Sequence, residues 1–305
     1  MKKPFRRAFI EITNSCNLAC GFCAASSRPK VFMPLEAFEA AAAQAGELAA
    51  VIFLHLLGEP FMHPRFPEIL GVCSHLKLKV NLVTNGVLLD KFGPDIFSEK
   101  CLGQVSVSLH ALKELSPALR AQSLRRLTDF ALRRPPGVIV SFRLRGNPAD
   151  LFIKEAKAIL LEALAQDGAG ERVRGLPRTL ARAREKVRGG LKLREGVYLN
   201  FGSIFDWPRT LARAREKVRG EPGGEHGQAK EGCLGLRHHF GILSDGRVVP
   251  CCADFDGALA LGNVNERPLA DILGSPAAQA LRDSIAGKTP MPPYCASCGF
   301  TAPDS

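Results

Sequence analysis

Three cysteines within eight residues form the most concentrated group of potential metal ligands in this chain of 305 residues. They are Cys16, Cys20 and Cys23, with Phe22 directly before the third. Three thiolates can hold three irons of a 4Fe–4S cluster and leave the fourth iron open to a molecule that chelates through an amine and a carboxylate. A zinc knuckle or a disulfide loop is the alternative interpretation of the same residues.

A second group of cysteines lies far downstream, at Cys233, Cys251, Cys252, Cys295 and Cys298. Four thiolates are enough to ligate one 4Fe–4S cluster completely, and Zn²⁺ is the alternative for a site of four cysteines. Of the adjacent pair Cys251 and Cys252, we take Cys251 as the ligand, because it completes a glycine-x4-cysteine spacing with Gly246. The predicted set is therefore Cys233, Cys251, Cys295 and Cys298.

The segments that must position these ligands alternate between apolar runs of strand length and helical patterns. We expect strands at 9–13, 51–57, 79–84, 104–109, 138–144 and 191–199, and helices at 34–45, 67–76, 88–98, 115–132 and 151–165. Such alternation with short loops predicts a parallel sheet in an α/β fold, and six units favour a partial (β/α)6 barrel over a closed eightfold one. A hairpin at 240–250 and short helices at 268–273 and 277–285 follow in a small cysteine-rich α+β region.

Polar residues and glycines occur repeatedly where the expected strands end. Besides the cysteine loop, these are Gly58-Glu59-Pro60, Asn85 and Ser108. In parallel α/β barrels, the carboxyl ends of the strands form the rim that binds ligands. The pattern therefore predicts that these groups share a binding site.

Together, these motifs resemble the radical S-adenosylmethionine (radical SAM) superfamily over residues 5 to about 200, and its C-terminal SPASM/Twitch module over 231–300. The resemblance implies that Cys16, Cys20 and Cys23 bind the catalytic 4Fe–4S cluster, whose fourth iron takes the amine and carboxylate of S-adenosyl-L-methionine. Gly58-Glu59-Pro60 is similar to the family's G-G-E-P motif, with Leu57 in place of the first glycine. The implied contacts to S-adenosylmethionine come from Phe22, Gly58, Glu59, Pro60, Asn85, Ser108 and Arg143.

The resemblance also implies a chemistry. An electron from a partner such as flavodoxin or ferredoxin cleaves S-adenosylmethionine to a 5′-deoxyadenosyl radical, which abstracts a hydrogen from the substrate. The spacing and the end of the chain at Ser305 lead us to expect a single auxiliary cluster, as in shorter Twitch-like members. Such a cluster accepts an electron from a substrate radical, and the reaction becomes a two-electron oxidation like that of aminocyclitol or sugar dehydrogenases. A peptide-modifying maturase is the alternative; Asp254 and Asp256 are either the substrate base or turn residues.

Charge and composition suggest a different class of function, which we weigh against the first. The net charge of +11 invites a metal-bound RNA-binding protein, but the 13-residue segment PRTLARAREKVRG occurs twice, at 177–189 and 208–220, and each copy contributes a net +4. We interpret it as a duplicated, solvated basic helix, so binding of nucleic acid is not expected. No segment has the length of a membrane span or the form of a signal peptide, and we expect a cytoplasmic protein. The predicted domains are 1–220, which ends in the duplicated segment 176–220, and 221–305.

Overall fold

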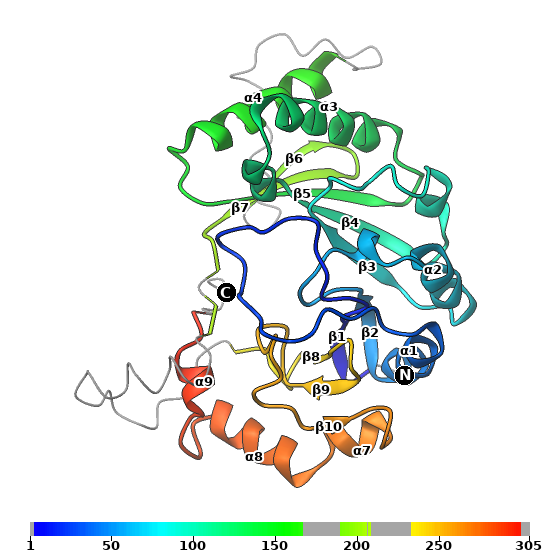
Figure 1. Ribbon diagram of the computed structural model, residues 1–305, viewed down its shortest axis with the longest axis vertical. Helices are drawn as coiled ribbons and strands as arrows, with labels where there is room; N and C mark the ends of the chain where they lie inside the picture. Colours follow the sequence, from blue (N-terminus) through cyan, green and yellow to red (C-terminus); the bar gives the residue numbers. More distant parts are fainter. Residues whose placement is uncertain (1–2, 167–189, 206, 209–232, 300–305) are drawn as a thin grey trace, which may run out of the picture. The chain divides into compact units, whose positions relative to one another are not determined.

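The computed structural model describes residues 3–166, 190–205, 207–208 and 233–299, which fall into two compact units. The first unit combines most of residues 1–79 with the C-terminal part from Phe205 onward, and the second contains 80–204 together with 17–20. Figure 1 shows the elements coloured along the chain. Each unit is built on five strands, and the parallel α/β core that the sequence predicts is confirmed.

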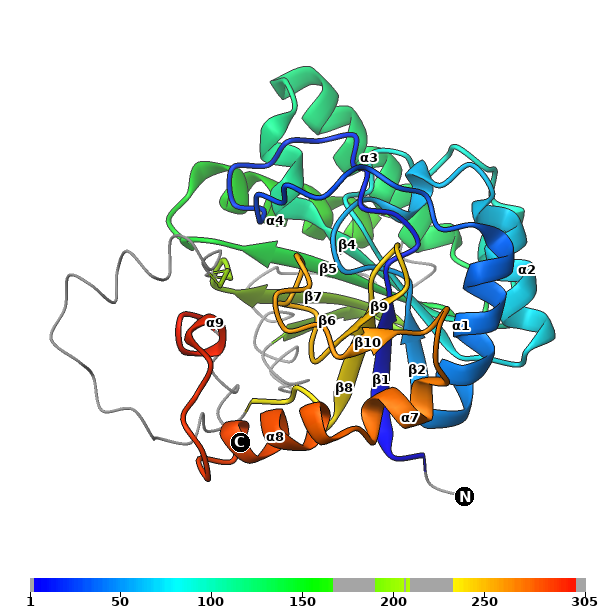
Figure 2. The same cartoon turned by 60° about the horizontal axis from the view of Figure 1, so that its bottom comes forward.

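The first unit is organised around β1 (Phe5–Ile10), which is paired on both sides. It runs parallel to β2 (Ala49–Phe53) on one side and to β8 (His239–Ile242) on the other. The predicted hairpin follows: β9 (Arg247–Val249) is antiparallel to β8, with the turn at Asp245 and Gly246, and β10 (Gly262–Asn263) is antiparallel to β9. Figure 2 shows β8 beside β1. The C-terminal hairpin therefore extends the N-terminal sheet, which the sequence did not predict.

Helices flank the sheet of the first unit. They are α1 (Leu35–Leu48), the 3₁₀ helix η1 (Pro60–Met62), α2 (Phe66–His75), α7 (Leu269–Leu273), α8 (Pro276–Ile285) and α9 (Pro293–Ala296). Helix α1 buries Phe38, Ala41, Ala42 and Ala45, a helical spacing that produces one apolar face. The helix continues three residues beyond its predicted end at residue 45. Gly46 does not end it and lies where a side chain has no room, since a Cβ there would lie 2.4 Å from Leu78 Cδ2.

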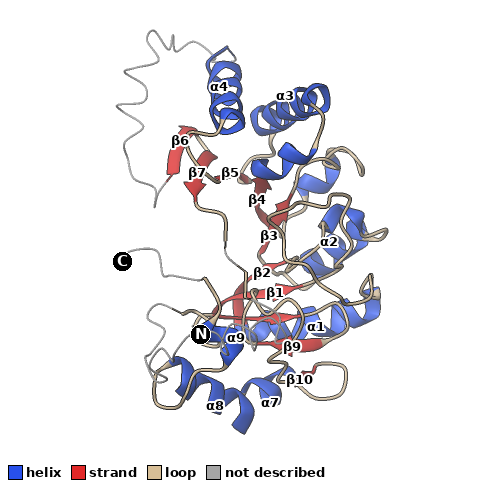
Figure 3. Cartoon of the chain, turned by 60° about the vertical axis from the view of Figure 1, so that its left-hand side comes forward, coloured by secondary structure: helices blue, strands red, loops and turns tan. Residues whose placement is uncertain are grey.

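The second unit contains four parallel strands in the order β3, β4, β5 and β7, with β6 antiparallel at the edge. The elements are β3 (Val80–Thr84), η2 (Asp95–Ser98), β4 (Leu102–Ser108), η3 (Leu109–Glu114), α3 (Pro117–Arg133), β5 (Ile139–Arg145), α4 (Leu151–Gln166), β6 (Gly190–Arg194) and β7 (Val197–Gly202). Figure 3 shows α3 and α4 side by side. Alternate residues of β5 and β7 are fully buried and form the core of this unit, among them Val140, Phe142 and Leu199.

Several predicted elements were wrong in type or extent. The helix expected at 88–98 is instead a series of turns and η2, because Gly93 takes a φ of +76° and Pro94 follows it. The single strand expected at 191–199 is the pair β6 and β7, which meet at Gly196 with a φ of +67°. The strands expected at 9–13 and 51–57 end early, at Ile10 and Phe53, and their remaining residues form the loops that carry the candidate site.

The basic repeat lies almost entirely outside the described residues, since only Pro208 of its two copies is described. The predicted domain boundary at 220/221 also lies outside them. Among the helices that the structure describes, none is long and apolar enough to cross a membrane.

Candidate functional site

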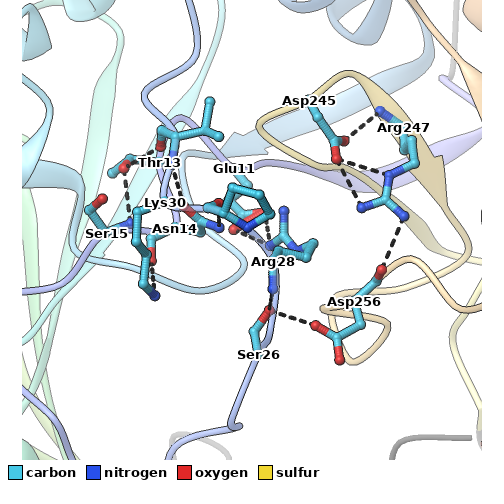
Figure 4. Close-up of polar contacts among 12 residues, drawn as sticks. Glu11, Thr13, Asn14, Ser15, Ser26, Arg28, Lys30, Asp245, Arg247 and Asp256 are labelled. Atoms are coloured by element: carbon cyan, nitrogen blue, oxygen red, sulfur yellow. Dashed lines mark hydrogen bonds and ion pairs between the residues drawn. The ribbon is translucent and has the colours of Figure 1, made fainter.

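The loop that carries the first cysteines begins in a segment fastened by side-chain hydrogen bonds. Thr13 Oγ1 donates to the carbonyl of Val31 over 2.8 Å, and Asn14 both donates to the Pro29 carbonyl and accepts from the Val31 amide, each over 2.8 Å. The amide of Ser15 in turn donates to Thr13 Oγ1 over 3.0 Å. Both ends of the cysteine loop, 13–15 and 29–31, are therefore tied together, with Cys16 directly after the tie (Figure 4).

The turn Gly58-Glu59-Pro60 lies directly against the start of this loop. The amide of Glu59 donates to the Ser15 carbonyl over 2.8 Å. Gly58 takes a φ of +76°, and a Cβ at this position would lie 2.3 Å from the Thr13 carbonyl oxygen. Only glycine therefore allows the turn to approach so closely. Tertiary structure brings together the cysteine motif and the turn after β2, two features that are 42 residues apart in sequence (16 to 58).

Glu59 itself is almost fully buried, with 1% of its surface exposed. Its Oε1 accepts a hydrogen bond from the Phe61 amide over 3.3 Å and caps η1. A buried carboxylate that is held in this way can accept a further hydrogen bond from a cationic amine, because each of its oxygens has two lone pairs. The side chain is thus of the right type for the predicted contact with the amine of S-adenosylmethionine.

Sequence reasoning missed a buried ion pair beside the loop. Nη2 of Arg28 lies 2.6 Å from both carboxylate oxygens of Glu11, and their side chains are 8% and 0% exposed. Burial raises the pKa of Glu11 to about 7, against the opposing effects of Arg28 and of the Ser244 amide. The one visible signal in the sequence is a charged residue inside the apolar run 9–12, which such pairing explains.

The thiols of Cys16 and Cys23 lie close enough to affect one another. The surrounding protein atoms and, next, the Cys16 thiol raise the pKa of Cys23. Neighbouring thiols that raise each other's pKa are typical of a set that a metal converts to thiolates on binding. Cys16 and Cys23 both keep exposed surface, whereas Cys73 and Cys101 are buried.

The second unit contains three further residues that we predicted to contact S-adenosylmethionine, namely Asn85, Ser108 and Arg143. Asn85 follows β3 and donates from Nδ2 to Oδ1 of Asn17, the neighbour of Cys16, over 2.8 Å. Ser108 and Arg143 are register partners on β4 and β5. Nδ1 of the buried His110 donates to the Arg143 carbonyl over 3.2 Å. Asn85 and Ser108 therefore lie at strand ends as expected and Arg143 lies within β5; the contact of all three with S-adenosylmethionine stays a prediction.

The C-terminal cysteines converge on the end of the hairpin and on α9. A Cβ on Gly235 would lie 3.4 Å from Cys251 Cβ and 3.7 Å from Cys233 Sγ, so these two flank one glycine. Burial, and after it the Cys252 thiol, raises the pKa of Cys251 well above its usual range, and Asp254 and Cys295 add to the effect. The amide of Cys298 donates to the Cys295 carbonyl over 3.2 Å and places the last two cysteines on one turn.

The adjacent cysteines Cys251 and Cys252 have different surroundings. Cys252 packs against the apolar cluster of Phe9, Leu56, Leu243 and Val249, and Cys251 lies close enough to Cys252 and Cys295 for both thiols to raise its pKa. Cys251 as the ligand stays a prediction. No group of three or more His, Cys, Asp or Glu side chains in the described part of the chain is arranged to hold a single metal ion. Thiolates are the ligands that iron–sulfur clusters require, so the donor chemistry fits a cluster at both sets.

The two aspartates after the cysteine pair differ in their surroundings. Asp254 is fully buried and accepts hydrogen bonds from the amides of Ala258 (2.8 Å) and Leu259 (3.0 Å); burial raises its pKa to about 6. Asp256 instead accepts a 2.5 Å hydrogen bond from Ser26 Oγ. Asp254 thus organises the turn, in agreement with its interpretation as a turn residue. Its raised pKa also suits a group that exchanges protons near neutral pH, as a substrate base would.

Known families match both regions of the chain. A family model described as "Radical SAM superfamily" matches residues 10–131, and SPASM, described as "Iron-sulfur cluster-binding domain", matches 233–299. Among curated proteins, the Fe-coproporphyrin III synthase of Methanosarcina barkeri (strain Fusaro / DSM 804) is 29% identical over 135 residues, which are 43% of this chain. The matched part is 33% of that protein's length, so the chain spans about a third of this relative.

Solved structures share the fold at low sequence identity. BtrN in complex with AdoMet and 2-DOIA superposes with a TM-score of 0.56 at 14% identity, over 99% of this chain and 95% of that one. Streptococcus suis SuiB bound to the precursor peptide SuiA has a TM-score of 0.59 at 18% identity, over 97% and 70% of the chains. The anSMEcpe protein with AdoMet and the Kp18Cys peptide has a TM-score of 0.59 at 13% identity, over 96% and 95%.

These matches confirm the predicted family, fold and cofactors: the two domains imply 4Fe–4S clusters, and several of the neighbours were crystallised with AdoMet. The chain carries a radical SAM superfamily domain over residues 10–131 and a SPASM iron–sulfur cluster-binding domain over 233–299.

Proposed function

We propose that this enzyme oxidises a small substrate, of the aminocyclitol or sugar type, by two electrons. The observation that carries the proposal is the hydrogen bond from the Glu59 amide to the Ser15 carbonyl, because it holds the candidate S-adenosylmethionine turn beside the first cluster ligand. The four C-terminal thiols add a set that can close one further cluster. When bound, the clusters and S-adenosylmethionine supply a 5′-deoxyadenosyl radical and an acceptor for the substrate's electron.

The residues of the chain have separate tasks in this proposal. Cys16, Cys20 and Cys23 hold the catalytic cluster, and Glu59 accepts a hydrogen bond from the methionine amine. Phe22 flanks the adenine, Gly58 and Pro60 shape the turn, and Asn85, Ser108 and Arg143 orient the rest of the cofactor; Arg143 can pair with a carboxylate. Cys233, Cys251, Cys295 and Cys298 hold the auxiliary cluster. Asp254 or Asp256 takes the proton that the substrate loses, and a reducing partner such as flavodoxin or ferredoxin supplies the electron in the cytoplasm.

Similarity of fold also supports a second candidate function. The structures of SuiB and anSMEcpe contain peptides, whereas that of BtrN contains 2-DOIA, and all three superpose about equally well. A peptide-modifying maturase is therefore the alternative. Mass spectrometry separates the two: loss of two hydrogens from a sugar or aminocyclitol supports the dehydrogenase, and modification of a precursor peptide supports the maturase.

The central test measures release of 5′-deoxyadenosine by reconstituted protein that is given dithionite and S-adenosylmethionine. Replacement of Cys16, Cys20 and Cys23 by Ala should abolish the release, because the first cluster loses its ligands. Replacement of Cys295 and Cys298 should spare the release and stop substrate turnover. Cys101→Ala is the matched control, because this cysteine is buried elsewhere, and the variant should retain its iron. A wild-type protein that binds zinc, lacks iron and releases no 5′-deoxyadenosine would contradict the proposal.

A further inference from the structure

Trp207 links the first cysteine loop to the turn that follows Cys251 and Cys252. It is the only tryptophan of the chain. Its Nε1 donates to the carbonyl of Phe22, which lies between two of the predicted cluster ligands, over 3.1 Å. Its ring meets the ring of Phe255 edge to face, with centroids 5.6 Å apart at 89°. Phe255 is 2% exposed and follows the adjacent cysteines 251 and 252 by three residues.

A second contact joins the same two segments. Ser26 Oγ donates to Oδ1 of Asp256 over 2.5 Å and accepts from the Arg28 amide over 3.2 Å. The Asp256 carbonyl also accepts from Nη1 of Arg247 over 3.1 Å. Figure 4 shows this chain of contacts from the loop to the hairpin. The cysteine loop is thus joined to residues 255 and 256 by two contacts. One passes through Trp207, which donates a hydrogen bond to the loop and packs on Phe255. The other is the charge-assisted hydrogen bond between Ser26 and Asp256.

The turn that receives both ties is itself tightly held. The buried Asp254 carboxylate accepts the amides of Ala258 and Leu259, and Gly257 adopts a φ of +71°. A Cβ on Gly257 would lie 2.4 Å from Arg247 Nη1, so the backbone packs directly against the guanidinium. These contacts constrain both the carboxylate and the backbone of the turn.

We propose that Trp207 and the Ser26–Asp256 hydrogen bond are positioning contacts that couple the two cysteine sets. Through them, the conformation of the turn at 254–257 controls the order of residues 22–28, and thereby the placement of Cys23. The role of this coupling in catalysis rests on the proposed function, because that role requires both cysteine sets to hold clusters. The mechanical coupling does not depend on iron and can be measured without it.

The test is a double-mutant cycle on the full chain, read by hydrogen–deuterium exchange of residues 22–28. Asp254→Ala loosens the turn, and Trp207→Leu with Ser26→Ala removes both ties. Asp254→Ala should speed exchange at 22–28 by at least threefold when the ties are intact, and should add nothing when they are absent. Ser284→Ala is the matched control: Ser284 is buried and donates to the Pro290 carbonyl, away from the turn, so exchange at 22–28 should not change.

A second readout uses the single tryptophan, whose emission reports Trp207 alone. Asp254→Ala should shift this emission to the red, as the ring loses its packing on Phe255. If Trp207→Leu does not fold, Trp207→Phe with Ser26→Ala replaces it; it keeps ring packing, loses the N–H donor and should give intermediate exchange. Unchanged exchange and emission in Asp254→Ala, or equal effects with and without the ties, would overturn the coupling. Iron content and 5′-deoxyadenosine release of the same samples test the proposed function separately.

Discussion

Arg28 and Glu11 form a buried ion pair in which one guanidinium nitrogen lies 2.6 Å from both carboxylate oxygens. Glu11 directly follows β1, and Arg28 lies five residues after Cys23. The pair therefore anchors the far end of the cysteine loop to the strand at the centre of the first unit. Its net contribution to folding is limited by desolvation, but the loss of one partner leaves the other charge buried without compensation.

Arg28→Leu should therefore destabilise the protein strongly, by about 3 kcal/mol or more at pH 8. The effect should shrink as the pH falls from 8 towards 6, because Glu11, whose pKa burial raises to about 7 and the loss of Arg28 raises further, is then protonated and no longer requires a cation. Chemical denaturation at pH 6 and pH 8 measures both values. Arg126→Leu breaks an exposed ion pair with Asp90 and is the control, with an expected change below about 1 kcal/mol. Equal effects of the two variants at both pH values would refute the assignment.

Gly58→Ala should distort the loop that carries Cys16, Cys20 and Cys23. The added Cβ would lie 2.3 Å from the Thr13 carbonyl and the residue would keep a positive φ, a combination that costs about 1–3 kcal/mol. We expect a lower melting temperature and at least a twofold loss of iron from the reconstituted protein. Gly71→Ala is the control: Gly71 lies in α2 with nothing within 4 Å of the added Cβ, so it should be neutral or slightly stabilising. A fully loaded Gly58→Ala protein of normal stability would contradict the close approach.

Glu59→Gln should weaken the binding of S-adenosylmethionine. A hydrogen bond between a carboxylate and a charged amine contributes about 1.5–3 kcal/mol, so the dissociation constant should rise roughly 10- to 100-fold. Equilibrium dialysis of the reconstituted protein measures it. Glu68→Gln alters a half-exposed carboxylate on α2 and should leave the affinity unchanged. Wild-type affinity in Glu59→Gln would remove Glu59 from the binding site.

His110 should make the protein less stable in acid. Burial lowers its pKa to about 4, below the unfolded value of 6.5, so the unfolded chain binds a proton that the folded one does not. Stability is then lost as the pH falls from about 6.5 towards 4, by up to roughly 3 kcal/mol. His110→Gln retains a donor for the Arg143 carbonyl and does not titrate. Unfolding free energies of the two proteins should diverge over this range; parallel curves would show that His110 is not the cause.

Much of the parallel core could be predicted, because strands buried on both faces are continuously apolar and their ends carry turn residues. The segments that became β3, β4 and β5 are recognisable in this way. Turn chemistry was harder to anticipate: Gly93 and Gly196 adopt positive φ values that end or divide elements which an apolar count would continue. The pairing of β8 with β1 joins residues more than 230 positions apart (7 to 239), and local patterns do not encode it.

The sequence by itself determined which chemistry to expect, because the spacing of Cys16, Cys20 and Cys23 and the carboxyl group of Glu59 predict a set of ligands without coordinates. Tertiary structure decided how those ligands are held. The contact of Glu59 with Ser15, the pair of Arg28 with Glu11, and the contact of Trp207 with Phe22 each join residues that are distant in the chain. Such contacts arise from packing and burial, which depend on the whole fold and leave no periodic trace in a single sequence.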